Sequence, residues 1–444
     1  MKKNILYVAL LAFAFLQVAC ENNKEQYLED YNTILYFRNS GVIEHPIYKP
    51  EELSQCVVSV VKAGSNLSAT PSVLLEIMDD GMLTEYNQSQ GTNYKALPEN
   101  CYSIKTGSLT FDPSEAFKKI ELSFYTEAIN AIPQSNYIVP LYLSNASDSI
   151  NKEKKYMFIK PEIITPLVRL DKTGYVMNTF PETGPSRLEL NLPVNLSIEN
   201  KWSFNCYTEV SQDLLDKYNR EQGVNYMLLP ANAYTMNKDG IVGMNLQEAG
   251  SLKVEVNRES LIYGNYALPI LLKGTSIETI EVDPLRKSCL LGVSYVPDAN
   301  KLKPVRLNVA MVSYHPNSIC EGSVAELFDG DAGTYFHSDY SVGKPLPHWL
   351  QFALPEECTV FRFEYLTRNA GEHVIPRQIT LYGSTDGADF KKIVVMDNGL
   401  PLEPGKTYTS PVIVAGGKIK HIRMTVDNSL SGSFALAEFR LWTL

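Results

Sequence analysis

A short acidic stretch in the last third of the chain offers oxygen atoms at close spacing. It covers residues 326–338 and places Asp329, Asp331 and Thr334 around a glycine turn. Calcium prefers about six to eight oxygen ligands, and a tightly folded loop could bring these side chains together. Asp-Gly is also ordinary turn chemistry, so the spacing alone also fits a solvated acidic turn.

Several motifs accompany this stretch in a fixed order. They are Asp-Gly-x-x-x-Thr-x-Phe at 329–336, Trp-Leu-Gln-Phe-Ala-Leu at 349–354, Ser-Thr-Asp-Gly at 384–387 and Ala-Glu at 437–438. Together they resemble the coagulation factor V/VIII type C, or discoidin, family, which includes the family 32 carbohydrate-binding modules. Phe336 stands where that family usually has tryptophan. The resemblance covers roughly residues 305–444 and implies a β-sandwich jelly-roll of eight strands.

The resemblance also implies a structural calcium ion that joins the acidic loop to the last strand. The ligands it implies are the side chains of Asp329, Asp331, Thr334 and Glu438 and the backbone carbonyls of Glu326 and Ala437. Asp331 could instead be solvated.

In the same family, ligands bind to loops at one end of the sandwich. A sugar site needs an apolar ring and a few hydrogen-bonding groups, and five residues in loop-like stretches supply them: Tyr340, Arg368, Asn369, His373 and Phe434. Phe434 follows Ser-Gly-Ser, where we expect an exposed ring. Arg368 could instead brace its loop and Asn369 could form a turn, whereas Trp349 and Trp442 are expected in the core.

The strands that would position these loops show alternation with a period of two. Phe361, Phe363 and Tyr365 would share one face of a strand, and Ile422 and Met424 one face of another. This pattern is typical of half-buried strands.

The middle of the chain contains an internal repeat. The pattern Tyr-Asn-x-x-Gln-Gly-x-Asn-Tyr-x-x-Leu-Pro-x-Asn-x-Tyr begins at Tyr86 and recurs at Tyr218, an offset of 132 residues. This period is far longer than that of solenoid repeats. Alternating apolar residues around each copy indicate short strands and a β-sandwich, and one short helix is expected before each motif.

The repeated block resembles the paired immunoglobulin-like domains of Bacteroides surface glycan-binding lipoproteins, which also precede some family 18 endoglycosidases. Its tyrosine and asparagine side chains could bind sugar, but a shared packing role is the favoured interpretation. The predicted fold is therefore all-β, with two tandem immunoglobulin-like β-sandwiches at 31–165 and 166–297. A discoidin-type domain at 298–444 would follow them.

The N-terminus has the features of a targeting segment. Lys2 and Lys3 precede an apolar run at 5–19 that ends at Ala19-Cys20. This resembles a bacterial lipoprotein signal, with residues 1–19 removed, lipid on the thiol of Cys20 and a linker at 20–30. Gln17 departs from the usual pattern, and an ordinary secretory signal with an incidental cysteine is the alternative.

Composition excludes several classes of function. The 444 residues suggest two to four domains, and a net charge of −10 argues against nucleic-acid binding. The six cysteines after Cys20 form no C-x-x-C motif, and Cys320 with Cys358 is the pair to test for a disulfide. The sequence lacks a nucleophile elbow, a zinc-protease motif and a phosphate loop. Its many acidic residues leave a glycosidase carboxylate pair open, but the three expected modules occupy the chain and none has a barrel pattern, so we expect a protein that is not an enzyme.

The resulting hypothesis is a lipid-anchored protein that binds oligosaccharides or polysaccharides at the bacterial outer membrane, on the cell surface. A glycan importer complex and endoglycosidases are the partners that the resemblance implies. The alternative is an adhesion or assembly protein whose C-terminal domain binds another protein.

Overall fold

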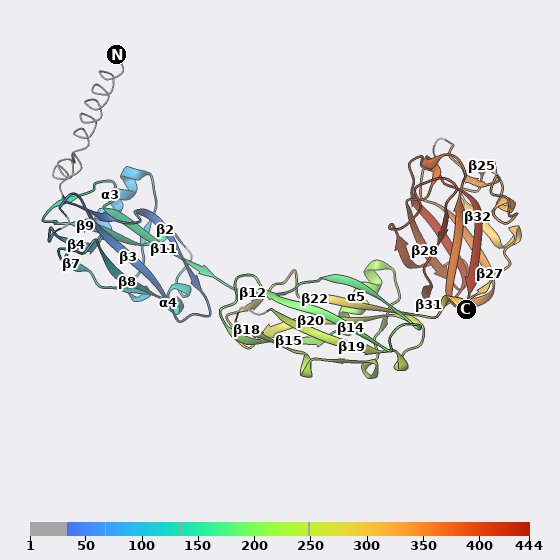
Figure 1. Cartoon of the computed structure of the whole chain (residues 1–444), viewed down its shortest axis with the longest axis horizontal. Helices are drawn as coiled ribbons and strands as arrows, with labels where there is room; N and C mark the ends of the chain where they lie inside the picture. The colour runs from blue at the N-terminus through green and yellow to red at the C-terminus, as the bar shows by residue number, and fades with distance from the viewer. Residues whose placement is uncertain (1–32, 67, 134, 247–248, 342, 344) are drawn as a thin grey trace, which may run out of the picture. The chain divides into compact units, whose positions relative to one another are not determined.

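The structure is a computed structural model, and it describes residues 33–444 apart from 67, 134, 247–248, 342 and 344 (Figure 1). The chain divides into two compact units, Met1–Pro166 and Leu167–Leu444. The proposed signal segment and Cys20 lie outside the described residues. The described elements are mainly strands, so the predicted all-β class is confirmed.

The first unit contains two sheets around one core. The first sheet has the order β10 (Ser149–Ile150), β1 (Ile34–Phe37), β3 (Leu53–Ala63), β8 (Phe117–Tyr125) and β6 (Tyr102–Ile104). The second has the order β2 (Gly41–Tyr48), β11 (Tyr156–Ile164), β9 (Tyr137–Ser144), β4 (Ser72–Ile77) and β7 (Gly107–Thr110), and β5 (Lys95–Ala96) pairs with β9. Helices α3 (Asp80–Gln90) and α4 (Thr126–Asn130) connect strands of this unit.

The second unit begins with a sandwich of the same topology. Its first sheet has the order β17 (Tyr234–Met236), β19 (Gly250–Asn257), β14 (Arg187–Leu196), β12 (Leu167–Leu170) and β21 (Glu281–Val282). The second has the order β13 (Gly174–Pro181), β22 (Ser288–Val296), β20 (Gly264–Thr275), β15 (Ser203–Val210) and β18 (Ile241–Asn245), and β16 (Met227–Leu228) pairs with β20. Helix α5 (Gln212–Gln222) corresponds to α3.

The repeated sequence block has a structural role in both sandwiches. Each helix ends at a left-handed glycine with φ 65°, Gly91 or Gly223, a backbone conformation that favours glycine. The side chain of Asn87 then bonds both the N–H and the C=O of Tyr94, and Asn219 does the same to Tyr226. The tyrosines pack into small aromatic clusters. These contacts support the packing interpretation of the repeat.

The C-terminal part of the second unit forms one continuous sheet of ten strands. Its order is β25 (Ile319–Gly322), β26 (Phe336–Ser338), β32 (Ala435–Thr443), β27 (His348–Thr367), β31 (Ile413–Asn428), β28 (Gln378–Ser384) and β29 (Lys391–Met396). The short strands β23 (Lys303–Pro304), β24 (Val312–His315) and β30 (Thr407–Thr409) pair beside this path. Strand β27 shifts register between Ala353 and Cys358. Its first half pairs with β24 and its second half with β32 and β30, so the sheet folds around a core.

The residues of that core follow the period-two alternation of apolar residues seen in the sequence. Phe361, Phe363 and Tyr365 are fully or almost fully buried, as predicted. The two tryptophans expected in the core are only half-buried, which corrects that prediction. The Arg423 guanidinium lies 4.5 Å from the Trp349 ring, and that of Arg362 lies 4.8 Å from the Trp442 ring. Each tryptophan ring therefore lies near the surface and forms a cation–π contact with an arginine.

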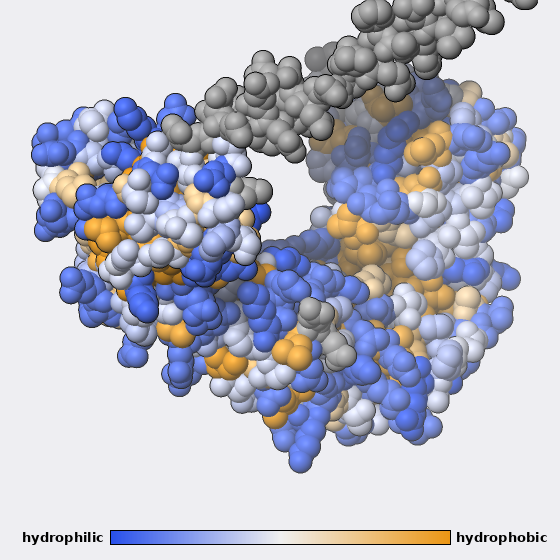
Figure 2. Space-filling model, turned by 60° about the vertical axis from the view of Figure 1, so that its left-hand side comes forward, coloured by the Kyte–Doolittle hydropathy of each residue, from blue (hydrophilic) through white to orange (hydrophobic). Residues whose placement is uncertain are grey.

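The cysteines from Cys56 onward are free thiols, including the pair proposed for testing. Cys358 is buried, whereas Cys320 is exposed and its Sγ lies 2.9 Å from Oδ1 of Asp339. The face in Figure 2 is largely hydrophilic, with hydrophobic residues in small groups among polar ones. Within the part of the chain that the structure describes, no helix is long and apolar enough to cross a membrane.

Candidate functional site

A cavity of about 390 Å³ lies among the loops at one end of the C-terminal sheet. Its polar and aromatic lining comprises Glu321, His337, Tyr340, Arg368, His373, Ser431 and Ser433. Strands β25 and β26 supply Glu321 and His337, and Arg368 directly follows the end of β27. Residues far apart in sequence therefore converge because neighbouring strands end at the same edge of the sheet.

Glu321 is the centre of the hydrogen bonding in this cavity. Its Oε2 lies 3.2 Å from the Tyr335 hydroxyl, from Nη1 of Arg368 and from Nδ1 of His337. The hydrogen bond from His337 is the main cause of a lowered pKa for Glu321, with further contributions from Tyr335 and Arg368. The carboxylate is therefore ionised at neutral pH and fixes three neighbouring side chains.

The second ring nitrogen of His337 faces Ser433. Nε2 lies 3.1 Å from the Ser433 hydroxyl, and burial lowers the pKa of His337, although Glu321 opposes the shift. A neutral imidazole donates through one nitrogen and accepts through the other. We therefore assign the proton to Nδ1, which donates to Glu321, so that Nε2 accepts from Ser433.

One aromatic ring lines the cavity and a second, that of Tyr335, lies behind Arg368. The side chain of Tyr340 is 50% exposed, and its ring lies 4.8 Å from the imidazole of His337. The guanidinium of Arg368 lies 3.9 Å from the ring centre of Tyr335, which holds the cation in place. An exposed ring beside an oriented carboxylate and guanidinium can bind a small ligand that carries both apolar C–H faces and hydroxyl groups.

The structure brings together three of the five residues predicted to bind sugar: Tyr340, Arg368 and His373 all line the cavity. Asn369 is exposed beside it but is not part of its lining.

The expectation of an exposed ring at Phe434 is wrong. Phe434 is fully buried, and its ring lies 5.7 Å from that of Phe336. Its backbone N–H donates to Oγ of Ser338 while its C=O accepts from Ser338 N–H, so the serine-rich tip is pinned to β26 and the ring turns inward. The apolar run Phe-Ala-Leu-Ala that begins at Phe434 was the available signal for a buried strand.

Sequence reasoning missed Glu321 and His337. His337 lies at the end of the acidic stretch, but it was given no role. Glu321 has no informative spacing to its partners, since Arg368 is 47 residues further along the chain. Only the pairing of β25 with β26, which places Glu321 opposite His337, reveals this pair.

The predicted calcium loop is folded on itself. Oδ1 of Asp329 accepts from Asp331 N–H at 2.9 Å, and Oδ2 accepts from the Thr334 hydroxyl at 2.8 Å. These bonds lower the pKa of Asp329. Side-chain atoms of Glu326 instead accept from the backbone N–H groups of Ser323 and Tyr335, which leaves its carbonyl as the group proposed for calcium.

The environment of Glu438 is the observation that favours a bound cation. It is buried, and its Oε1 has no hydrogen-bond partner. Burial raises its pKa, and the charges of Asp329 and Asp331 raise it further. An orphaned carboxylate oxygen facing two more carboxylates fits a hard cation. Among the described residues, however, no three His, Cys, Asp or Glu side chains converge as a metal-binding group, so calcium remains a prediction.

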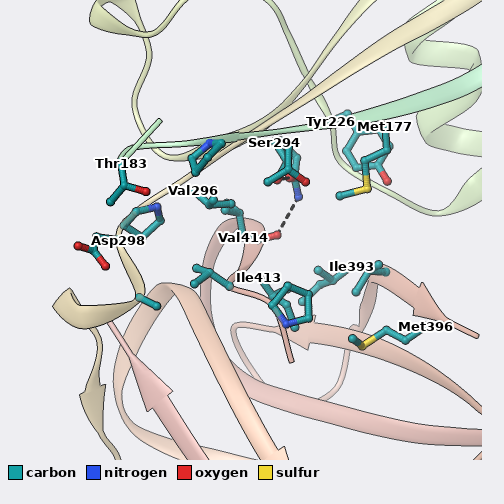
Figure 3. Close-up of a pocket in the computed structure, with 18 of the residues that line it drawn as sticks. Met177, Thr183, Tyr226, Ser294, Val296, Asp298, Ile393, Met396, Ile413 and Val414 are labelled. Carbon is teal, nitrogen blue, oxygen red and sulfur yellow. Dashed lines mark hydrogen bonds between the residues drawn. The ribbon is translucent and has the colours of Figure 1, made fainter. Parts of the chain in front are cut away.

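A second cavity in the second unit, of about 360 Å³, lies between the sandwich that begins at β12 and the C-terminal sheet (Figure 3). Its lining is mainly apolar, with Met177, Val296, Ile393 and Met396 among the residues labelled in Figure 3. We call this contact between the sandwich and the C-terminal sheet the joint. The side chain of Asn265 bridges it, because its Nδ2 donates to Val414 C=O at 2.8 Å. The joint therefore has a covered polar contact and an apolar void.

Two family models match the chain. One, described as a "-like, N-terminal domain", matches residues 28–150 and 171–279, together more than half of the chain. The other, the F5/8 type C domain, matches residues 313–438. A comparison with curated proteins finds no match.

Matching solved structures include domains of bacterial proteins. A family 32 carbohydrate-binding module of Clostridium perfringens in complex with GalNAc-β-1,3-galactose is 22% identical and covers 29% of this chain and 92% of its own, with a TM-score of 0.25. A module of the same family from C. perfringens NanJ, in complex with galactose, is 15% identical over 30% of this chain and 93% of its own, with a TM-score of 0.24.

A two-domain protein of unknown function from Bacteroides fragilis is 13% identical over 63% of this chain and 95% of its own, with a TM-score of 0.29. The family models, rather than these structures, carry the assignment. The chain therefore belongs to the family defined by this N-terminal domain, which it contains twice, and it ends in an F5/8 type C domain.

Proposed function

We propose that this protein is a non-catalytic, lipid-anchored carbohydrate-binding protein that captures glycans at the bacterial outer membrane for degradation and uptake. The observation that carries the proposal is the loop cavity of the F5/8 type C domain. There the exposed ring of Tyr340 lies beside the hydrogen-bonded set of Glu321, His337 and Arg368.

The chemistry of these groups suits a sugar. The apolar face of a pyranose can stack on the Tyr340 ring, while its hydroxyls donate to the Glu321 carboxylate and accept from Arg368. Because Glu321 already holds its neighbours in place, little side-chain entropy is lost when the ligand binds. An open cavity of about 390 Å³ suits one or two sugar units rather than an enclosed polymer.

The anchor and the partners belong to the same proposal. Cys20 would carry the lipid, and the two sandwiches would separate the binding domain from the membrane. A single open site binds modestly, so display of many copies on one surface would raise the effective concentration for a polymeric glycan. A glycan importer complex and neighbouring endoglycosidases would then receive the captured chain.

A glycan array probed with the full mature chain tests the proposal. We expect binding to one glycan class, and we expect Tyr340→Ala and Arg368→Ala each to weaken it about tenfold or more through loss of stacking or of a charge-assisted hydrogen bond. Tyr125→Ala is the matched control, because Tyr125 is an exposed tyrosine (41%) in the first unit. Binding that survives both substitutions would exclude this cavity as the site.

Calcium binding is also part of the proposal. Glu438→Gln tests it, because the variant should change thermal stability differently depending on whether calcium binds. If calcium binds beside Asp329, the substitution removes a ligand, so added calcium should no longer raise the unfolding temperature of the second unit. If no cation binds, the substitution removes a buried charge whose Oε1 has no hydrogen-bond partner and should stabilise the fold. Thermal unfolding of wild type and variant with calcium and with a chelator distinguishes the two outcomes.

A further inference from the structure

The two tandem sandwiches differ at one edge of their first sheets. In each, the outermost strand is only three residues long: β6 in the first sandwich and β17 in the second. β6 pairs with residues 122–124 of β8, and β17 pairs with residues 254–256 of β19. The preceding half of β8 and of β19 therefore has no outer strand beside it among the described residues.

In the second sandwich, a side chain fills this gap. Asn237 is the first residue after β17, and its Oδ1 accepts from Lys253 N–H at 2.9 Å. Its Nδ2 donates to Ser251 C=O at 3.2 Å and to Ile241 C=O at 3.1 Å. A carboxamide has the same donor and acceptor as a peptide group, so Asn237 acts as one peptide unit of a missing strand.

In the first sandwich, the equivalent position holds Lys105. The register with Tyr102 and Tyr234 makes Lys119 and Glu121 the counterparts of Ser251 and Lys253. Alternate residues of an antiparallel strand direct their backbone groups to the same neighbour, so Lys119 C=O and Glu121 N–H point outward. No hydrogen bond equivalent to those of Asn237 reaches them within the described residues.

An open groove of about 630 Å³ lies at this place in the first sandwich. Lys105 and Lys119 line it together with Glu121, and the hydroxyls of Ser103, Ser108 and Ser123 add to its polar surface. The turn after β6 is also one residue shorter than its counterpart, since Gly107 corresponds to Gly240. A missing amide and a shorter turn thus leave a polar notch beside β8.

We propose that this notch binds an extended polypeptide segment of a partner protein, which adds to the sheet as a strand beside β8. The peptide groups of the partner would satisfy Lys119 C=O and Glu121 N–H, as Asn237 satisfies their counterparts. Two lysines against one glutamate favour a segment that carries an Asp or Glu side chain.

The geometry favours a strand over an isolated amide. The outward backbone groups repeat every second residue along β8, which is the repeat of a paired strand. The groove is lined by several residues of β8, including Lys119, Glu121 and Ser123, whereas a single amide would satisfy only one donor–acceptor pair. A second copy of this chain is the competing occupant, because pairing β8 with itself can place Lys119 opposite Glu121; a dimer of the full chain in solution would replace the partner protein with that copy.

Hydrogen exchange on the full mature chain tests the proposal. The probe is the synthetic peptide acetyl-Thr-Val-Asp-Val-Thr-Val-amide, and its control is the same peptide with N-methyl groups on alternate amides, which cannot pair as a strand. We expect the probe to slow exchange in residues 117–123 by at least about tenfold, and we expect no change from the control peptide. Equal protection by both peptides, or by neither at millimolar concentration, would overturn the proposal.

Matched variants use the other sandwich as the reference. Lys105→Asn should slow exchange of Glu121 N–H without peptide and weaken peptide binding about tenfold, because the amide occupies the notch. Asn237→Ala should expose Lys253 N–H and create a second site for the peptide. If Lys105→Asn does not slow exchange, replacing residues 105–107 with the longer Asn-Lys-Asp-Gly turn gives the second version of the same test.

Two outcomes would assign the notch another role. Protection of residues 117–123 by N-acetylglucosamine but not by the peptide would replace the polypeptide with an acetamido sugar. Unchanged exchange with both ligands, together with self-association of a Lys105→Thr, Lys119→Thr double variant, would mean that the lysines serve only to prevent edge-to-edge aggregation. Glu121→Pro, which deletes the outward N–H at an edge position that tolerates proline, should abolish peptide binding and leave the unfolding temperature nearly unchanged.

Discussion

The two cavities of the second unit have similar volumes but different chemistry. The loop cavity is about 390 Å³ and the joint cavity about 360 Å³. In the loop cavity, Glu321 and Arg368 bond to each other and remain partly exposed to solvent beside the exposed Tyr340 ring. In the joint cavity, the Asn265 amide is buried and already occupied by Val414 C=O and the Ser294 hydroxyl.

The difference shows that volume alone does not identify a ligand site. A hydroxyl-rich ligand in the joint cavity would lose water and find few unoccupied donors or acceptors, which costs free energy. The same ligand in the loop cavity would meet the Glu321 carboxylate, the Arg368 guanidinium and an exposed ring. We therefore assign the loop cavity to ligand binding and the joint cavity to the packing of two domains.

The largest expected effect that bears on this comparison is a loss of stability when the polar contact at the joint is removed. Asn265→Leu leaves Val414 C=O and the Ser294 hydroxyl buried without partners, and each unpaired group costs about 1–3 kcal/mol. We expect the free energy of unfolding of the second unit to fall by about 2–4 kcal/mol, as measured by denaturant titration, while glycan affinity is unchanged. A loss of glycan binding in the folded variant would mean that the joint contributes to recognition.

The first sandwich provides the matched control for this change. Asn136 corresponds to Asn265 in the repeat, but it is exposed and bonds to the Asn93 side chain. Water replaces that bond when it is removed, so Asn136→Leu should cost less than about 1 kcal/mol. Equal costs at the two positions would show that burial does not explain the role of Asn265.

The next effect concerns affinity at the loop cavity. Glu321→Gln keeps the shape of the side chain but removes the charge that orients Arg368 and His337, so we expect about tenfold weaker glycan binding. The Glu321 side chain is 40% exposed, and such ion pairs contribute less than about 1 kcal/mol to stability. Glycan affinity, measured by isothermal titration, should therefore fall while the unfolding temperature stays nearly unchanged. A large fall in unfolding temperature would indicate a structural role for Glu321 instead.

The sequence predicted the elements better than it predicted the site. The period-two alternation of Phe361, Phe363 and Tyr365 reports a buried face directly, because each residue carries its own burial preference. A packing role for the repeated Asn87 and Asn219 is predicted because asparagine favours turns, and in the structure each bonds a tyrosine seven residues away.

The site was harder to predict because its centre depends on strand pairing. Glu321 acquires its role only when β25 lies against β26 and the end of β27 lies nearby. The prediction of an exposed ring at Phe434 was wrong because its serine-rich surroundings indicated a loop. In the structure, the backbone N–H and C=O of Phe434 both bond to Ser338, and the ring turns inward. Non-local hydrogen bonds, which no spacing encodes, decided both cases.

The smallest expected effect is a dependence on pH that only the loop cavity should show. Burial holds the folded-state pKa of His337 below its usual value of 6.5, so the unfolded chain takes up its proton first as the pH falls. The contribution to stability is therefore complete above about pH 6.5 and is lost below it, by about 1.4 kcal/mol for each unit between the two pKa values. His337→Gln should flatten the pH dependence of unfolding between pH 7 and 5. Protonation also turns Nε2 into a donor and breaks the bond that it accepts from Ser433, so wild-type glycan affinity should fall over the same range. An affinity that rises on acidification would show that the ligand prefers the charged imidazole, and the proton assigned to Nδ1 alone would then be wrong.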